Sequence, residues 1–303
     1  MIFEDNSIRI DYDGSGEKIK AHQMNAKLVA DSISAMNFII DESYKEIRKI
    51  YHAELDAEVF IDGGFGEGSL WWLLRILGQG ENVQGNLSFQ SVFKKITQAL
   101  NKVIEIMKKI SPNKTEIVIT QQEEGNYTIE VDGKSVVLDE LEAAILSNKK
   151  IRASISDLVR PLLEEGIDTL NISPSHYENS AIKINKEERD SLLIERQYKT
   201  LLDEGTVTGK YYIETLSYNK KSRWKIIPKD EPRNGFNVSI IDEIFLASVA
   251  ANREKFAKDD LLDLQLHWKK EKTSFSGKIK TTYTVTTVFD HISVDTSLQE
   301  ELL

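Results

Sequence analysis

The sequence predicts an α+β protein in which a mixed sheet with two long amphipathic helices is followed by a small C-terminal β-barrel. In residues 25–51 and 88–110, apolar side chains recur every three or four positions, which is typical of helices that bury one face. From residue 206 to residue 292 the pattern changes to roughly five short runs of β-branched and aromatic residues, with one helical segment among them. Such a series favours a small, partly closed barrel, because curling hides the unpaired edges of a sheet.

These patterns divide the chain into four parts: an α+β body (1–185), a helical linker (186–204), the barrel (205–292) and an acidic tail (293–303). The body opens with a strand at residues 8–12, where apolar and polar side chains alternate. Asn25 is suited to cap the first long helix, since its side chain can accept a hydrogen bond from a free amide of the first turn. Ser111 precedes a proline and should end the second long helix.

The middle of the body is predicted to hold two hairpins, two helices and a further strand. Alternating runs between residues 115 and 138 are separated by turn residues at 124–126 and at Asp132-Gly133. Helical patterns follow at 139–147 and 150–165, and a strand pattern at 166–172. The spacing within 88–110 also fits a coiled-coil assembly helix, although packing on the protein's own sheet is the simpler interpretation.

Composition excludes several kinds of site. The 303 residues are 40% hydrophobic and 29% charged, as in a folded globular protein. There are no cysteines, so disulfides, thiolate nucleophiles and iron–sulfur clusters are excluded. No secretory signal is visible, and the longest nearly uncharged apolar run, residues 69–78, is half of what a membrane-spanning helix needs. We therefore expect a soluble, cytoplasmic protein for which a membrane is an unlikely partner.

Charge is distributed unevenly along the chain. Residues 1–204 hold 24 basic and 35 acidic side chains, whereas residues 205–292 hold 15 basic and 11 acidic ones. The tail adds three acidic residues, which completes the net charge of −10. A mildly basic barrel attached to an acidic body is the one clear electrostatic asymmetry.

The glycine-rich stretch between Phe60 and Gly80 raises the question of a nucleotide site. A phosphate-binding loop of the triphosphatase type needs a lysine after its last glycine, but Gly68 is followed by Ser69. A dinucleotide fingerprint would need a third glycine where Ser69 stands, and a βαβ chain around it. We interpret the stretch as strand, turn and strand. A nucleotide-binding enzyme or sensor that uses this turn stays an alternative.

Two adjacent tryptophans follow the turn. On a strand, Trp71 and Trp72 point to opposite faces of the sheet. Both rings could be buried in a two-sided strand, which is the simplest interpretation. Alternatively one of them lies at a subunit interface, where tryptophan is a frequent hot spot, or, less plausibly, against a membrane.

The predicted barrel interleaves cations with aromatic rings. Trp224 and Trp268 are the rings in question, and the cations are Lys220, Lys221, Arg223 and Lys225 around the first and Lys269, Lys270 and Lys272 after the second. Single-stranded nucleic acids bind to small curled sheets that combine stacking rings with a charged groove. Against this, the excess of positive charge is small, and lysines also protect sheet edges from aggregation.

No set of residues has the spacing of a catalytic or metal site. The five histidines lie far apart, and neither an H-E-x-x-H helix nor a G-x-S-x-G elbow occurs. Acidic clusters such as Glu187-Glu188 stand at predicted helix starts, where helix dipoles and hydration explain them. We therefore predict no catalytic residues, no metal and no cofactor.

Several segments together resemble an uncharacterised family of bacterial, plasmid and prophage proteins. They read "IRIDYDG", "GIDTLNI", "IIDEIFLASVAANREKFAKDDLLDLQLHW" and "TYTVTTVFDH", and the resemblance covers most of the chain. The resemblance implies a mobile-element or phage–host-conflict setting, and it supplies no site residues. The resulting hypothesis is a non-enzymatic, self-associating protein whose partner is another protein or a second copy of itself. Single-stranded nucleic-acid binding by the barrel is the alternative.

Overall fold

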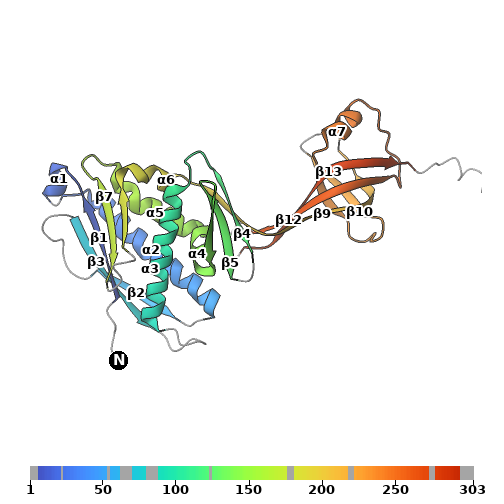
Figure 1. The fold of residues 1–303 in the computed structure, drawn as a ribbon. Helices are drawn as coiled ribbons and strands as arrows, with labels where there is room; N and C mark the ends of the chain where they lie inside the picture. The colour runs from blue at the N-terminus through green and yellow to red at the C-terminus, as the bar shows by residue number, and fades with distance from the viewer. Residues whose placement is uncertain are drawn as a thin grey trace, which may run out of the picture. The chain divides into compact units, whose positions relative to one another are not determined.

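The computed structural model describes residues 6–21, 23–52, 55–61, 70–79, 88–122, 125–175, 181–217, 222–272 and 277–293. Within them the protein is a mixed α+β fold with a closed five-stranded barrel (Figure 1). The chain divides into two compact units, of which the first runs to Thr200 and the second begins at Leu201. None of the described helices is long and apolar enough to cross a bilayer.

The first unit alternates strands and helices along the chain. Its elements are β1 (Asn6–Asp13), α1 (Glu17–Lys20), α2 (Ala26–Tyr51), β2 (Asp56–Ile61), β3 (Leu70–Gln79), α3 (Phe89–Lys109), β4 (Glu116–Gln121), β5 (Asn126–Val131), β6 (Lys134–Asp139), α4 (Glu140–Ser147), α5 (Lys149–Val159), η1 (Arg160–Leu163), β7 (Thr169–Pro174), β8 (Ile182–Asn185), η3 (Lys186–Glu188) and α6 (Arg189–Leu193).

Five of these strands form a sheet in the order β2-β3-β1-β7-β8. Every pairing in this sheet is antiparallel, which corrects the expectation of a mixed sheet for the body. A hairpin brings β3 back beside β2. The helical connections from β1 to β2 and from β3 to β7 return the chain in the same direction, but β3 lies between β1 and β2, and β1 lies between β3 and β7, so neighbouring strands run antiparallel. A helical connection between two strands therefore does not show that adjacent strands of this sheet are parallel, although two parallel strands do need a long connection of this kind.

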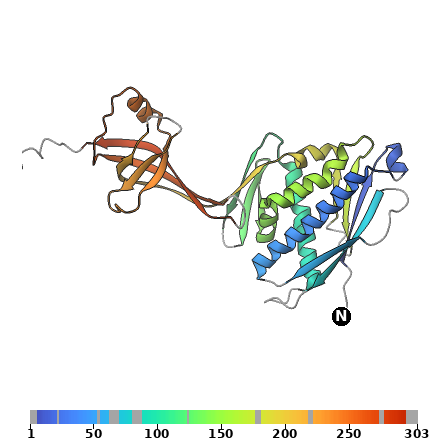
Figure 2. The same cartoon turned by 180° about the vertical axis from the view of Figure 1, so that it is seen from behind.

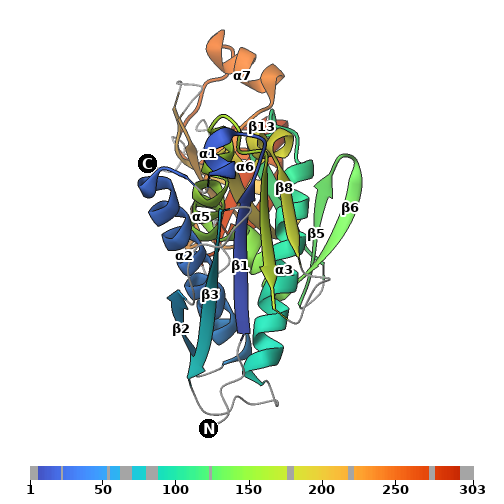
Figure 3. The ribbon, with the colours of Figure 1, turned by 90° about the vertical axis from the view of Figure 1, so that its left-hand side faces the viewer.

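Helices α2, α3 and α5 cover one face of this sheet (Figures 1 and 3). Helices α2 and α5 lie side by side, as Figure 2 shows. The side chain of Asn25 accepts a hydrogen bond from the amide of Lys27, and that of Ser88 accepts one from Ser91, so both long helices begin with a polar cap. The core lies between the helices and the inward side chains of the sheet, with Ile10, Trp72 and Ile104 among its buried members.

The strands on either side of the glycine-rich turn pair as the hairpin interpretation predicts. Asp56 lies opposite Gln79 and Ile61 lies opposite Leu74, in an antiparallel register. The turn itself, residues 62–69, falls outside the described residues, and so does the nucleotide site that we considered for it.

The second unit is the barrel, built from β9 (Gln197–Thr215), β10 (Trp224–Pro228), β11 (Phe236–Ile240), β12 (Leu261–Lys272) and β13 (Lys280–Ile292), with α7 (Glu243–Ala250) after β11. The strands follow the order β10-β11-β13-β12-β9, and a further pairing of β9 with β10 closes the ring. The barrel is thus closed rather than partly closed. Its pair β11–β13 is parallel. The acidic tail beyond Ser293 lies outside the described residues.

Residues 186–204 are helical only in their first half. Helical structure ends with α6 at Leu193, and β9 begins at Gln197. The amide of Gln197 donates to the carbonyl of Thr115, and Lys199 pairs with Glu116 of β4 at 2.9 Å. Arg196, Tyr198 and Thr200 are buried while Gln197 and Lys199 are not, a period of two that fits a strand. Many charged residues precede Gln197, and they hid the change from helical spacing to the alternation of a strand.

Candidate functional site

Strand β3 separates the two adjacent tryptophans onto opposite faces of the five-stranded sheet. Trp72 is 1% exposed and packs against Tyr12, with the ring centroids 5.5 Å apart. Burial of its neighbours at even positions, such as Leu74, places this side of the strand under the helices. Trp72 therefore belongs to the core and is not available to a partner.

Trp71 lies on the other face, away from the helices, and is partly exposed. The guanidinium of Arg9, on the neighbouring strand, lies 4.6 Å from the centroid of its ring, which is within the range of a cation–π contact. Arg9 is held in turn by Asp11, at 2.9 Å. The indole is thus fixed in position while one part of its surface stays open.

Trp71 is one of several large apolar side chains on this face. We call them the β3 face: Phe60, Trp71, Leu73 and Leu77, together with the cations Arg9 and Arg75. Phe60 is 42% exposed and lies opposite Arg75 in the β2–β3 register, and Glu58 lies opposite Leu77. In the strand register each of these apolar side chains lies opposite a charged one. Aromatic residues and arginines on one open surface are typical of protein–protein interfaces.

The barrel places its two tryptophans differently from each other. Trp224 is 2% exposed, and its Nε1 donates a hydrogen bond of 3.0 Å to the carbonyl of Ser217. Phe245 and Phe256 pack edge-on against its ring. The ring lies in the barrel core and has no free face for a nucleic-acid base, so it cannot take the stacking role that the sequence indicated.

Trp268 lies on the long β12 strand and is partly exposed. A Cβ added at Gly205 would lie 2.8 Å from Cζ2 of this ring, so the indole packs on the glycine backbone of β9. The ammonium of Lys270 lies 5.2 Å from the ring centroid. Trp268 is therefore the one predicted nucleic-acid ring that reaches the surface of the described barrel.

Acidic side chains of the neighbouring strand β9 pair with three of the seven predicted cations. Lys225 bonds to Glu214 at 2.9 Å, Lys269 to Glu204 at 3.1 Å, and Lys270 lies 4.0 Å from Asp203. Arg223 is exposed and has no ion pair among the described residues. Lys220 and Lys221 fall outside the described residues. The charge available on the described barrel surface is smaller than the sequence alone indicates.

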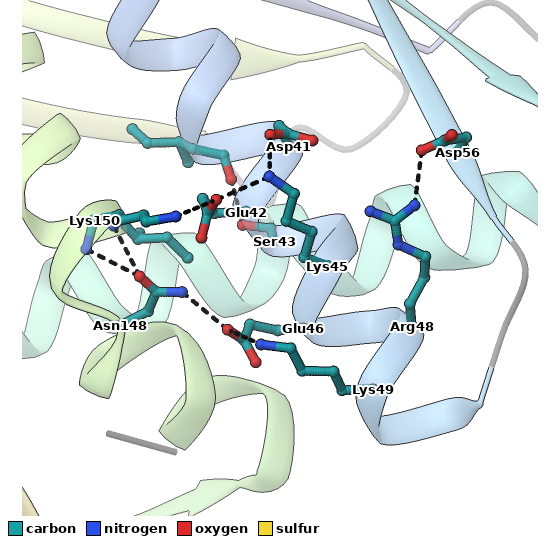
Figure 4. Close-up of polar contacts among 12 residues, drawn as sticks. Asp41, Glu42, Ser43, Lys45, Glu46, Arg48, Lys49, Asp56, Asn148 and Lys150 are labelled. Carbon is teal, nitrogen blue, oxygen red and sulfur yellow. Dashed lines mark hydrogen bonds and ion pairs between the residues drawn. The ribbon is translucent and has the colours of Figure 1, made fainter. Parts of the chain in front are cut away.

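Two carboxylates on α2 form the most buried ionic group of the first unit (Figure 4). Glu46 is 3% exposed and its Oε1 accepts hydrogen bonds from Lys49 and from Asn148, at 3.1 and 2.9 Å. Glu42 accepts from Lys45 and Lys150, at 3.0 and 3.2 Å. Each acid is neutralised by lysine, and no cluster of three metal-ligating side chains occurs in the described parts of the chain. The group fastens α2 to the junction of α4 and α5.

Sequence reasoning missed the setting of His291. Its Nδ1 lies 2.8 Å from Glu254 and its Nε2 lies 3.1 Å from Asp260, while the ring packs on Phe256. The hydrogen bond from His291 is the main reason that the pKa of Glu254 is lower than usual. No sequence signal could place His291 between these two carboxylates, because they lie 37 and 31 residues away in the chain. It fastens the connection between α7 and β12 to the end of β13.

Comparison with known proteins adds no assignment, since no family model, no curated protein and no solved structure matches the chain.

Proposed function

We propose that the protein is a non-enzymatic, self-associating protein that binds another macromolecule, and that the β3 face is its interaction surface. The observation that carries the proposal is Trp71, partly exposed on the same side of β3 as Leu73 and Leu77, on the sheet face that the helices leave open (Figure 3). Tryptophan and arginine are the residue types most enriched at binding hot spots, and here Arg9 stacks on the indole. A setting in phage–host conflict, which the sequence resemblance implies, is consistent with such a role.

The test is the mass of the protein in solution, measured by light scattering over a range of concentrations. We expect the wild type to exceed the 34.5 kDa of one chain and the double variant Trp71→Ala, Leu73→Ala to return to that mass. Val137→Ala, which truncates an exposed apolar residue on β6, is the control and should leave the mass unchanged. A wild type that stays at one chain at every concentration contradicts self-association through this face.

Single-stranded nucleic-acid binding is the second candidate, and one observation favours it. Counted from β9, the strands of the barrel run first, second, third, fifth, fourth and back to the first, with a helix between the third and fourth. This is the topology of OB-fold barrels, which bind oligonucleotides on strands two and three and on the adjoining loops. Arg223 stands on the connection between the first and second strands, next to Lys220 and Lys221 in sequence.

Fluorescence anisotropy of a labelled single-stranded oligonucleotide tests this candidate. Binding should weaken as salt rises, because phosphate contacts release counterions. The triple variant Lys220→Ala, Lys221→Ala, Arg223→Ala should weaken it further and flatten the dependence on salt. Lys134→Ala, a single charge removed from the first unit, should have no effect. Absence of binding at low salt would eliminate the candidate.

A further inference from the structure

A cavity of about 410 Å³ lies in the first unit between α5 and the segment that leads from α6 into β9. One side is formed by Lys149, Arg152, Ser156 and Arg160. These residues are three or four positions apart, so they share one face of the helix and its continuation. Residues 192–196 form the other side. We call this cavity the α5 pocket, and its size is within the range of small-molecule sites.

Arg152 is the unusual side chain of this pocket. A guanidinium carries five N–H donors, yet among the described residues that of Arg152 donates a single hydrogen bond, from Nη1 to the carbonyl of Leu146 at 2.7 Å. Its carbon lies 3.9 Å from the centroid of the Tyr198 ring, which holds the group in place. Removal from water lowers the pKa of Arg152.

Two donor nitrogens of Arg152, Nε and Nη2, donate no hydrogen bond to the described residues. Neither its Nε nor its Nη2 is sealed from solvent, and the side chain lines the pocket. Partly desolvated charged donors bond strongly to charged acceptors, since water competes less for them. Glu195, which lines the same pocket, attracts the guanidinium electrostatically but accepts no hydrogen bond from it, so these donors stay available to an acceptor from outside the described protein.

The other cations of the pocket differ in how firmly they are engaged. Lys149 pairs with Glu195 at 2.7 Å and Arg160 with Asp157 at 2.9 Å, but all four side chains are highly exposed. Exposed ion pairs are weak, so a ligand can compete for both cations. Arg196, by contrast, bonds to the carbonyls of Ile110, Lys114 and Ser191 and has a structural role.

We propose that the α5 pocket binds the oxyanion group, a carboxylate or a phosphate, of a small molecule, with Arg152 as the anchoring donor. Lys149 and Arg160 add positive charge at the rim, and the hydroxyl of Ser156 adds a neutral donor. Ala153 and Leu193 provide an apolar wall beside the cations. The preferred ligand therefore carries an apolar group next to its oxyanion. This site is separate from the β3 face and does not depend on it.

Calorimetric titration of the full-length protein tests the proposal with two probes, benzoate and phenyl phosphate, at an ionic strength held constant with sodium chloride. Saturable binding of either probe supports the site, and the probe that binds more tightly identifies the oxyanion. Arg152→Gln should weaken that binding at least about tenfold, because it removes charge-assisted hydrogen bonds. Lys134→Gln, the same change of charge on an exposed hairpin, should leave the affinity unchanged.

A second variant keeps the test decisive if Arg152→Gln fails to fold. Ser156→Asp retains the contacts of Arg152 with Leu146 and Tyr198 and adds a carboxylate at the pocket wall, so it should weaken binding by a similar factor. Two results would overturn the proposal. One is the absence of saturable binding of both probes to the wild type, and the other is unchanged affinity in Ser156→Asp.

Discussion

Glu42 and Glu46 lie one turn apart on the buried side of α2, where a carboxylate needs partners to stay ionised. Lysines and an amide supply these partners, and two of them, Asn148 and Lys150, belong to the start of α5 (Figure 4). Loss of one partner from a buried pair leaves an uncompensated charge, which costs far more than loss of an exposed ion pair. These side chains therefore fix how α2 and α5 pack together.

Glu42 gives a prediction about pH. Burial by itself would raise its pKa, but hydrogen bonds and charges from Lys45 and Lys150 outweigh burial and hold the pKa below its ordinary value. The unfolded chain then takes up a proton at higher pH than the folded protein does. The stability that Glu42 contributes is thus complete above the unfolded pKa of about 4.3 and is lost as pH falls through the folded pKa.

Glu42→Gln removes this titration, so the free energy of unfolding should fall less steeply from about pH 5 to pH 3 than it does in the wild type. Urea denaturation at a series of pH values measures the two slopes. Glu130→Gln, at an exposed carboxylate without a side-chain partner among the described residues, should follow the wild type. Identical slopes for Glu42→Gln and the wild type would show that the carboxylate contributes nothing.

At the scale of elements, the sequence predicts those whose signal is local. Asn25 caps the first long helix, and the alternation of apolar and polar side chains in β1 places Ile8, Ile10 and Tyr12 in the core. The turn residues between the barrel strands allow these strands to be counted from the sequence. These features depend on neighbours within a few residues, which is the distance over which periodicity and capping act.

Features that depend on distant partners could not be predicted in this way. Trp224 has cations on both sides in the sequence, but barrel closure turns its ring toward Phe245 and Phe256. The cations of β12 are offset by Glu204 and Asp203 on β9, far away in the chain. The α5 pocket joins residues of two segments that sequence reasoning treated as a helix and a linker. A single sequence holds no signal for such pairings.

The crossing of two loops at the ends of β1 and β7 gives a prediction at this scale. The amide of Gly16 donates to the carbonyl of Gly166, and that of Asp168 donates to the carbonyl of Asp13. A Cβ at Gly14 would lie 2.0 Å from the carbonyl oxygen of Gly166, which is backbone and cannot rotate away. Gly14→Ala should therefore lower the free energy of unfolding by about 3 kcal/mol, the upper range for overpacking.

Gly133→Ala is the matched control for this crossing. Gly133 has a φ of +73° in a hairpin turn and no atom within 4 Å of an added Cβ, so only backbone strain opposes alanine. We expect this substitution to lower the free energy of unfolding by about 1 kcal/mol. Urea denaturation compares the two variants with the wild type. An equal loss of unfolding free energy in Gly14→Ala and Gly133→Ala would mean that the two loops separate freely and that their contact does not hold β1 to β7.

At the scale of the whole molecule, each unit has its own hydrophobic core. The first core joins the helices to the five-stranded sheet, and the second, which includes Trp224, Ile226 and Leu264, fills the barrel. The barrel core is the smaller of the two. The denaturant dependence of unfolding scales with the surface that becomes exposed, so the two units should differ in this slope.

The distribution of tryptophans allows each unit to be followed separately. Trp71 and Trp72 belong to the first unit, whereas Trp224 and Trp268 belong to the second. In the variant Trp224→Phe, Trp268→Phe, fluorescence reports the first unit alone, and in Trp71→Phe, Trp72→Phe it reports the barrel. We expect the barrel to unfold with a smaller slope in urea and at a different midpoint, because each core can be lost without the other. Far-UV circular dichroism of the wild type should then show both transitions. A single transition with the same slope and midpoint by all three measurements would mean that the two cores unfold as one cooperative unit.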